Sequence, residues 1–213
     1  MNELLRHQDS SVRLRAALDI GTSPAPRFLD DLIERCAVEP DFQVREILTW
    51  ALIRHPVSLT MPRLIEEVRT GGAQARSQAL HTLSKIKAGA LESTAAWPVI
   101  TEDLLSDAND EVARSAWRAA VVLVPACSEP ALSRLLGTQL GRGGVEMQRS
   151  LSRALVALGS VIEPMLSEAA SSNDVAVRAH AQATEALLLD PDAGFAVFEA
   201  RRVDALGVID SAG

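Results

Sequence analysis

The chain has 213 residues, of which 47% are hydrophobic and 23% charged, so it can bury a sizeable core and is not predicted to be disordered. Only 3% of the residues are aromatic and none is tyrosine, which favours helices over sheets. The formal net charge is -7 and lysine occurs only at Lys85 and Lys87, which disfavours nucleic-acid binding, because phosphate contacts need clustered cations.

A short turn followed by an amphipathic helix recurs six times along the chain. The copies begin 30 to 37 residues apart, each at a residue type that is favoured at a helix N-cap. These first residues are Asp9, Asp41, Gly72, Asn109, Gly144 and Asp174. Apolar residues follow each cap at three, seven and eleven positions, which places them on one buried face of a helix. Glu185 interrupts this stripe in the last copy, as a terminal helix with few neighbours tolerates.

Five other segments with helical apolar spacing lie between these helices. They cover residues 27–37, 58–69, 93–107, 129–140 and 160–171. Four of them have a proline near the start, where helices accept it, whereas Pro98 is less clearly placed. Residues 1–8 form a truncated first helix, and residues 190–202 are predicted to form one more short helix. We therefore expect a repeat array over 1–190 and a C-terminal capping helix and tail over 191–213.

An acid, a valine and an arginine open three of the copies in the same register. They are Asp9, Val12 and Arg13, then Asp41, Val44 and Arg45, and finally Asp174, Val177 and Arg178. This pattern resembles the HEAT-repeat family of α-solenoids, especially the short HEAT-like repeats of the phycobilisome-lyase type. The resemblance covers roughly residues 1–190. It implies an all-α fold, a right-handed α-solenoid (superhelix) of about six helical hairpins, and is nearly silent about function.

In that family the acid and the arginine form a ladder between successive repeats. We therefore expect each arginine to pair with the acid of its own turn or of the next turn. Copies four and five have Ala113 and Gln148 at the arginine position, so we expect the ladder to be interrupted in the middle of the array.

Signatures of catalysis, metal binding and nucleotide binding are missing from the sequence. It contains no zinc-protease, serine-hydrolase, phosphate-loop or dinucleotide motif. Cys36 and Cys127 lack metal or redox spacing, and the four histidines are scattered. No apolar run approaches the roughly 20 residues that a membrane span needs. We expect a cytoplasmic protein that is not an enzyme, holds no cofactor or metal and does not enter a membrane.

A second line of residues follows the repeated helices, two, six and nine positions after each cap. In a HEAT-type solenoid the second helix of each repeat lines the concave side, so the resemblance implies that this line faces a groove. The candidate partner-binding residues are Arg15, Ile47, Trp50, Gln78, His81, Arg118, Arg153 and His180. An exposed Trp50 beside Ile47 is typical of interface anchors. The alternative is that these residues form an ordinary solvated helix face.

Three functions are compatible with these patterns. The first is a non-catalytic scaffold that binds an acidic or amphipathic segment of a protein or peptide partner, with Trp50 as anchor and Arg118 and Arg153 as counter-charges. The second comes from HEAT-like DNA glycosylases, which are similar in size and repeats. In this sequence, however, no tryptophan has the expected acid one turn later. The third is the attachment or chaperoning of a bilin, which the lyase-type resemblance implies. The oligomeric state stays open.

Overall fold

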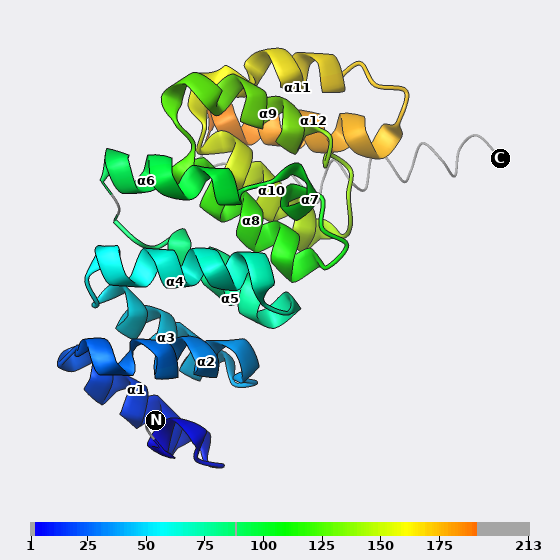
Figure 1. Ribbon diagram of the computed structural model, residues 1–213. Coiled ribbons are helices and arrows are strands. Elements are labelled where there is room, and N and C mark those ends of the chain that lie inside the picture. The colour runs from blue at the N-terminus through cyan, green and yellow to red at the C-terminus, as the bar shows by residue number, and fades with distance from the viewer. Residues whose placement is uncertain (1–2, 88, 191–213) are drawn as a thin grey trace. The chain divides into compact units, whose positions relative to one another are not determined.

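The computed structural model describes residues 3–87 and 89–190, except for the side chains of Ala90 and Leu91. Every regular element in this part of the chain is a helix, and no strand occurs in it (Figure 1). The all-α class is therefore confirmed. The predicted capping helix and tail over 191–213 lie outside the described residues. The chain divides into two compact units, Met1–Leu123 and Val124–Gly213.

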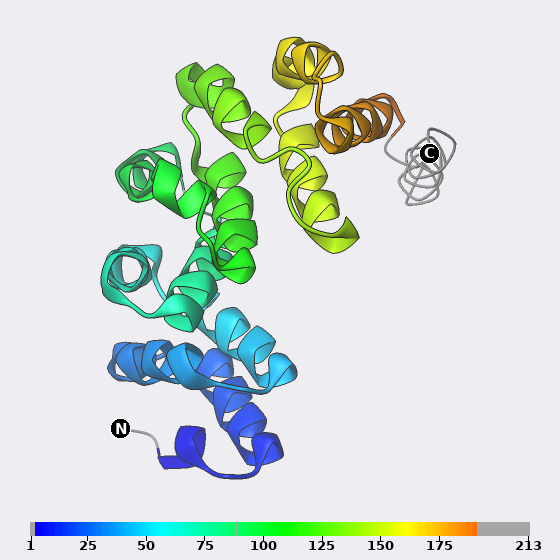
Figure 2. The same ribbon diagram turned by 90° about the vertical axis from the view of Figure 1, so that its right-hand side faces the viewer.

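The helices of unit Met1–Leu123 form two rows. The first, called the repeat row below, comprises α1 (Ser10–Thr22), α3 (Phe42–Ile53), α5 (Ala73–Leu83) and α8 (Asp110–Leu123). Its members pack in chain order, α1 on α3, α3 on α5 and α5 on α8 (Figures 1 and 2). The second row comprises α2 (Leu29–Val38), α4 (Val57–Thr70) and α6 (Ala90–Ala96). The remaining short helices are η1 (Glu3–Arg6), η2 (Pro26–Phe28), η3 (Trp97–Val99) and α7 (Glu102–Leu105).

Unit Val124–Gly213 shows the same alternation in its described residues. Its elements are η4 (Ala126–Ser128), α9 (Glu129–Gly137), α10 (Val145–Val156), η5 (Gly159–Ile162), α11 (Glu163–Ala169) and α12 (Val175–Leu189). The two helices that follow predicted caps, α10 and α12, pack on each other, and α9 packs on α11. Helix α11 also packs on α12, so each hairpin contributes one helix to each row.

All six predicted helix starts are confirmed, because each of these helices begins at the residue after its predicted cap. The side chains of Asp9, Asp41 and Asp174 each accept a hydrogen bond at 2.8 Å from the backbone N–H two residues further on. Asn109 accepts the equivalent bond at 3.0 Å. These contacts satisfy backbone donors that the first turn of a helix leaves without a partner. The two copies that begin with glycine have no such side chain.

The predicted apolar stripe forms the core of both units. The side chain three positions after the cap is buried in the four central copies and half-buried in the first and last copies. All six residues at the seventh position are buried, and so are those at the eleventh position, except Glu185, which is exposed. The stripe and its interruption at Glu185 are thereby confirmed. Full burial of a leucine such as Leu48 or Leu52 contributes about 1.5–3 kcal/mol to folding.

The predicted pairing of each arginine with an acid of its own or the next turn is confirmed only in part. Arg13 pairs with Glu39 and Arg76 with Asp107, each in the turn that opens the next repeat, whereas no printed ion pair joins these arginines to the cap aspartates Asp9, Asp41 and Asp174 in the described chain. Instead, Arg13, Arg45 and Arg178 each donate through Nη1 to the backbone carbonyl six residues earlier. Oδ1 of each of these aspartates already accepts from the first turn of its helix. The long guanidinium side chain reaches back to carbonyls of the preceding turn, and its planar array of donors satisfies them.

The ion pairs are interrupted at both Ala113 and Gln148, as predicted, because neither side chain is charged, whereas the hydrogen bonds to the preceding turn are lost only at Ala113. Gln148 takes over the role of the arginine, because its Nε2 donates to the carbonyls of Gly141 at 3.4 Å and Gly143 at 3.2 Å. Ala113 has no donor in its side chain and cannot replace the arginine. The shared requirement is therefore a side chain that donates to the preceding turn, which arginine and glutamine both meet.

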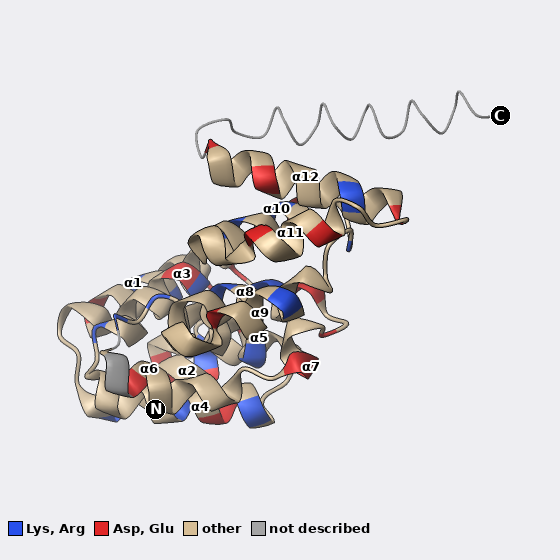
Figure 3. Cartoon of the chain, turned by 90° about the horizontal axis from the view of Figure 1, so that it is seen from above, with Lys and Arg blue, Asp and Glu red and all other residues tan. Residues whose placement is uncertain are grey.

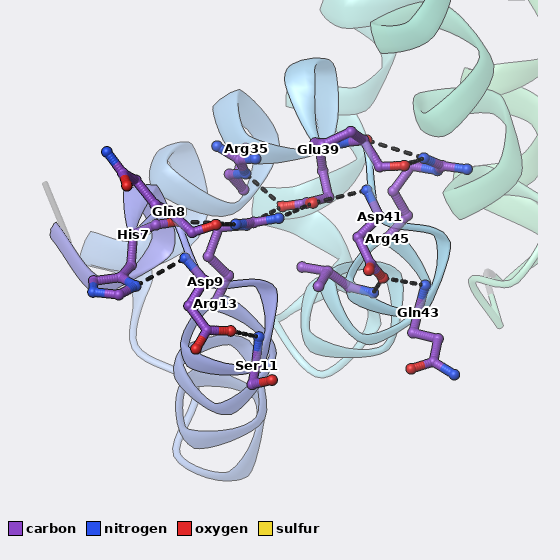
Figure 4. Close-up of polar contacts among 12 residues, drawn as sticks. His7, Gln8, Asp9, Ser11, Arg13, Arg35, Glu39, Asp41, Gln43 and Arg45 are labelled. Carbon is purple, nitrogen blue, oxygen red and sulfur yellow. Dashed lines mark hydrogen bonds and ion pairs between the residues drawn. The ribbon is translucent and has the colours of Figure 1, made fainter.

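Arg13 has in addition a buried carboxylate partner, Glu39, in the turn between α2 and α3 (Figure 4). Glu39 is 0% exposed, and its carboxylate accepts from Arg13 at 2.7 and 2.8 Å, from Arg35 at 2.7 Å and from the N–H of Asp41 at 2.9 Å. Burial by itself would raise the pKa of Glu39. The hydrogen bonds from Arg13, Arg35 and the Asp41 N–H outweigh it and hold this pKa at about 2. The network joins α1, α2 and α3.

The single helix predicted over 93–107 is wrong. The chain forms α6, then the 3-10 helix η3 that contains Pro98, and then the separate helix α7. Proline lacks the N–H that would continue an α-helix through this point. Thr101 starts α7, and its Oγ1 accepts from the N–H of Leu104 at 3.3 Å. The break places Val99 and Thr101 beside the end of α4 and the start of α5.

Candidate partner-binding face

Helix α3 presents a half-buried pair of apolar side chains, Ile47 and Trp50, one turn apart on the same face. The Trp50 ring packs directly on Gly21 of α1, where an added Cβ would lie 2.2 Å from Cζ3 of the ring. Glycine is required at this position because any larger residue would displace the indole. The guanidinium of Arg54 lies 5.7 Å from the ring centroid, within the range of a cation–π contact. Trp50 is therefore held in one place while part of it stays accessible.

A polar cluster continues this face across the next two helices. It is formed by Glu46 of α3, His81 of α5 and Arg118 of α8, and is called the Glu46–His81–Arg118 cluster below. Nε2 of His81 lies 3.3 Å from Oε1 of Glu46, and the His81 side chain is 13% exposed. Nη2 of Arg118 donates to Oγ of Ser115 at 3.0 Å. Three helices that are distant in sequence thus bring an acid, an imidazole and a guanidinium together.

The electrostatics of the cluster keep His81 neutral near pH 7. Burial lowers the pKa of His81, the carboxylate of Glu46 opposes this effect, and the nearby positive charge of Arg118 adds to it. Burial also lowers the pKa of Arg118, which nevertheless remains charged. The cluster therefore carries one negative charge, one positive charge and a neutral imidazole that can both donate and accept.

Three polar atoms of the residues on this face are buried and have no hydrogen-bond partner among the described residues. They are Oε1 of Gln78, Nε2 of His81, which lies near Glu46 without forming a hydrogen bond, and Nε of Arg118. The first is an acceptor, the last is a donor, and the imidazole nitrogen can be either. A buried polar atom without a partner destabilises the fold by about 1–3 kcal/mol, so such atoms mark positions where a bound group or solvent would be stabilising.

The structure separates the eight residues predicted from the sequence. Unit Met1–Leu123 contains six of them, namely Arg15, Ile47, Trp50, Gln78, His81 and Arg118. Ile47, Trp50, Gln78, His81 and Arg118 are half-buried on consecutive helices of the repeat row, and Arg15 is exposed on α1. The other two belong to unit Val124–Gly213, where Arg153 is exposed on α10.

The expected surface position of His180 is wrong, because its ring is buried and only 2% of the residue is exposed. Its Nδ1 accepts from the N–H of Gly141 at 3.0 Å, and its Nε2 lies 3.0 Å from both the carbonyl of Gln148 and Oγ of Ser152. This arrangement requires the neutral ring with its proton on Nε2. Burial lowers the pKa of His180 to about 4, although the bond to Gln148 opposes the effect. His180 thus fills a polar gap between α10 and α12.

Sequence reasoning missed Glu46, which completes the cluster. The glycosylase-type pattern places an acid one turn after a tryptophan, whereas Glu46 lies one turn before Trp50. A spacing of one helical turn, taken in both directions from Trp50, identifies Glu46. Of the other tryptophans, Trp117 is fully buried and donates to the carbonyl of Leu105 at 2.8 Å, so its ring belongs to the core.

Two broader features of the described chain bear on function. No helix in this part is both long enough and apolar enough to cross a membrane. Over the same residues, no group of three His, Cys, Asp or Glu side chains is placed to hold a metal ion.

When the chain is compared with known proteins, no protein-family model matches it and no curated protein matches it significantly. A functional assignment therefore depends on the geometry of the candidate face.

Proposed function

We propose that this chain is a non-catalytic scaffold for protein–protein interaction, built from HEAT-like repeats. In this proposal the helical hairpins continue as a right-handed α-solenoid of about six repeats. The face of α3, α5 and α8 is the binding surface. Repeat arrays of this kind use long faces made by successive helices to bind extended partners.

The observation that carries the proposal is the position of Trp50. A tryptophan that is fixed on Gly21 and Arg54 but remains partly accessible is preorganised, so little conformational freedom is lost when a partner covers it. Tryptophan is also the residue type most enriched among the energetically dominant positions of interfaces. Ile47 extends the apolar contact by one helical turn.

The chemistry of the face favours an amphipathic segment with an acidic residue. Its apolar side would cover Ile47 and Trp50, and the acidic residue would pair with Arg118. Arg118 has no carboxylate within ion-pair distance in the described chain, and its Nε has no partner. A charge-assisted hydrogen bond donated by Arg118 to a bound carboxylate would satisfy it. The partly exposed Glu46 would repel a second acid at the other end of the cluster.

A peptide-display selection on the immobilised protein tests this proposal. The enriched peptides should share an apolar residue and an acid at helical spacing, and Trp50→Ala should weaken their binding by tenfold or more. Arg118→Gln should weaken binding of acidic peptides but not of their amide counterparts. Arg114→Gln is the matched control, because Arg114 lies on the same helix and pairs with Glu111 instead. Equal binding to all variants, with helicity unchanged by circular dichroism, rules out this face as the binding site.

A further inference from the structure

A pocket of about 310 Å³ lies in unit Met1–Leu123 where the end of α4, the start of α5 and the segment from η3 to α7 meet. It shares no residue with the candidate partner-binding face. Its volume lies at the lower end of the roughly 300–1,000 Å³ that is typical of ligand pockets, so it suits a small molecule.

The base of the pocket is apolar. Val68 of α4, Val99 of η3 and Leu104 of α7 line it, and all three are largely withdrawn from solvent. This surface exists because the chain breaks at Pro98, so that η3 packs on α4 while α7 packs on α8. An apolar group of a ligand would replace water there.

One wall of the pocket is a fixed ion pair. Nε of Arg76 donates to the carbonyl of Val68 at 3.1 Å, and its Nη1 lies 3.6 Å from the carboxylate of Asp107. The carboxylate of Asp107 in turn accepts from the N–H of Asn109 at 2.8 Å. These groups are already engaged with each other, so they shape the wall without supplying an uncompensated charge.

The two remaining charges that line the pocket have opposite signs and are unpaired. Arg69, at the end of α4, and Asp103, in the acidic first turn of α7 (Figure 3), form no hydrogen bond or ion pair with any described residue. They also do not bind each other, so space separates them. Thr101 lies in the same lining, and its hydroxyl proton is free to donate because its oxygen accepts from Leu104.

We infer that this pocket binds a free α-amino acid with an apolar side chain. The carboxylate of the ligand would pair with Arg69, its ammonium with Asp103, and its side chain would cover Val68, Val99 and Leu104. An α-amino acid carries both charges and the apolar group on one carbon. It can therefore meet all three parts of a small pocket at once. A purely anionic ligand would be repelled by Asp103, and a purely cationic one by Arg69.

The carboxylate could also come from the C-terminal residue of a peptide, and three probes distinguish the sources. The binding of L-leucine, leucinamide and N-acetyl-L-leucine is followed by the backbone amide NMR signals of the full chain. L-leucine should shift the signals of Arg69, Thr101 and Leu104 saturably. Leucinamide, which lacks the carboxylate, and N-acetyl-L-leucine, which lacks the ammonium, should each bind about tenfold more weakly.

Matched variants assign the charges. Arg69→Gln should weaken L-leucine binding about tenfold, whereas Arg63→Gln should leave it unchanged, since Arg63 is on the same helix but pairs with Asp30. Asp103→Asn should remove the preference for L-leucine over N-acetyl-L-leucine, and Glu102→Gln should keep it. The inference is overturned if L-leucine causes no saturable shift, if leucinamide binds as well as L-leucine, or if N-acetyl-L-leucine binds equally to the unmodified protein. The last outcome would assign the pocket to peptide C-termini.

Discussion

Removal of the Glu39 carboxylate should destabilise unit Met1–Leu123 by about 3–5 kcal/mol. Glu39 is 0% exposed and Arg13 only 5%, so Glu39→Ala leaves a buried guanidinium without its counter-charge. Breaking one partner of a buried ion pair typically costs this amount. Arg35, which also pairs with Glu39, would lose the same partner at 2.7 Å.

Tryptophan fluorescence during urea unfolding is the appropriate assay, since Trp50, Trp97 and Trp117 all belong to unit Met1–Leu123. The transition therefore reports on this unit alone. The control is Glu34→Gln on α2, since the Glu34 side chain is 57% exposed and pairs with Arg6. An exposed pair contributes less than about 1 kcal/mol, so the control should barely move the midpoint. A loss below about 1 kcal/mol in Glu39→Ala would refute the claim that this network joins α1, α2 and α3.

The pH dependence of the same network has a definite sign. The pKa of Glu39 is about 2 in the folded chain, below its ordinary value of 4.5, so the unfolded chain binds the proton first as the pH falls. The contribution of Glu39 is complete above about pH 4.5 and is lost as the pH falls towards 2. In Glu39→Gln this part of the acid destabilisation should be absent.

Three further predictions concern single residues. The pKa of His180 is about 4 in the folded chain against an ordinary 6.5, so up to about 3 kcal/mol of stability of unit Val124–Gly213 should be lost between about pH 6.5 and 4. A loss of helical circular dichroism signal over this pH range, without a change in tryptophan fluorescence, would show this. The same pH dependence of stability in His180→Gln as in the unmodified protein would contradict it. Gly21→Ala should displace the Trp50 ring and cost about 1–3 kcal/mol, with greater iodide quenching; unaltered quenching would argue against the packing. Gly72→Asp should stabilise unit Met1–Leu123 by about 0.5–1 kcal/mol in urea, because the residue has extended backbone and open space around its Cβ position. A lower midpoint would contradict it.

The candidate site was only partly predictable. The register that selected Ile47, Trp50, Gln78, His81 and Arg118 follows from helical periodicity, and these residues do lie on consecutive helices of one row. The same register selected His180, which is buried. The difference cannot be read from spacing, because it depends on how closely α12 packs on α10.

The helix starts and the buried stripes were determined by the sequence alone. An aspartate that accepts from N–H groups two or three residues further on, and apolar residues at a period near 3.6, act within a few residues of chain. The tertiary structure alone decided which groups meet across long separations in sequence. Examples are Arg13 with Glu39, His81 with Glu46, and Arg76 with Asp107. The physical reason is that burial and charge pairing depend on distances between helices, and neither periodicity nor local hydrogen bonding specifies those distances.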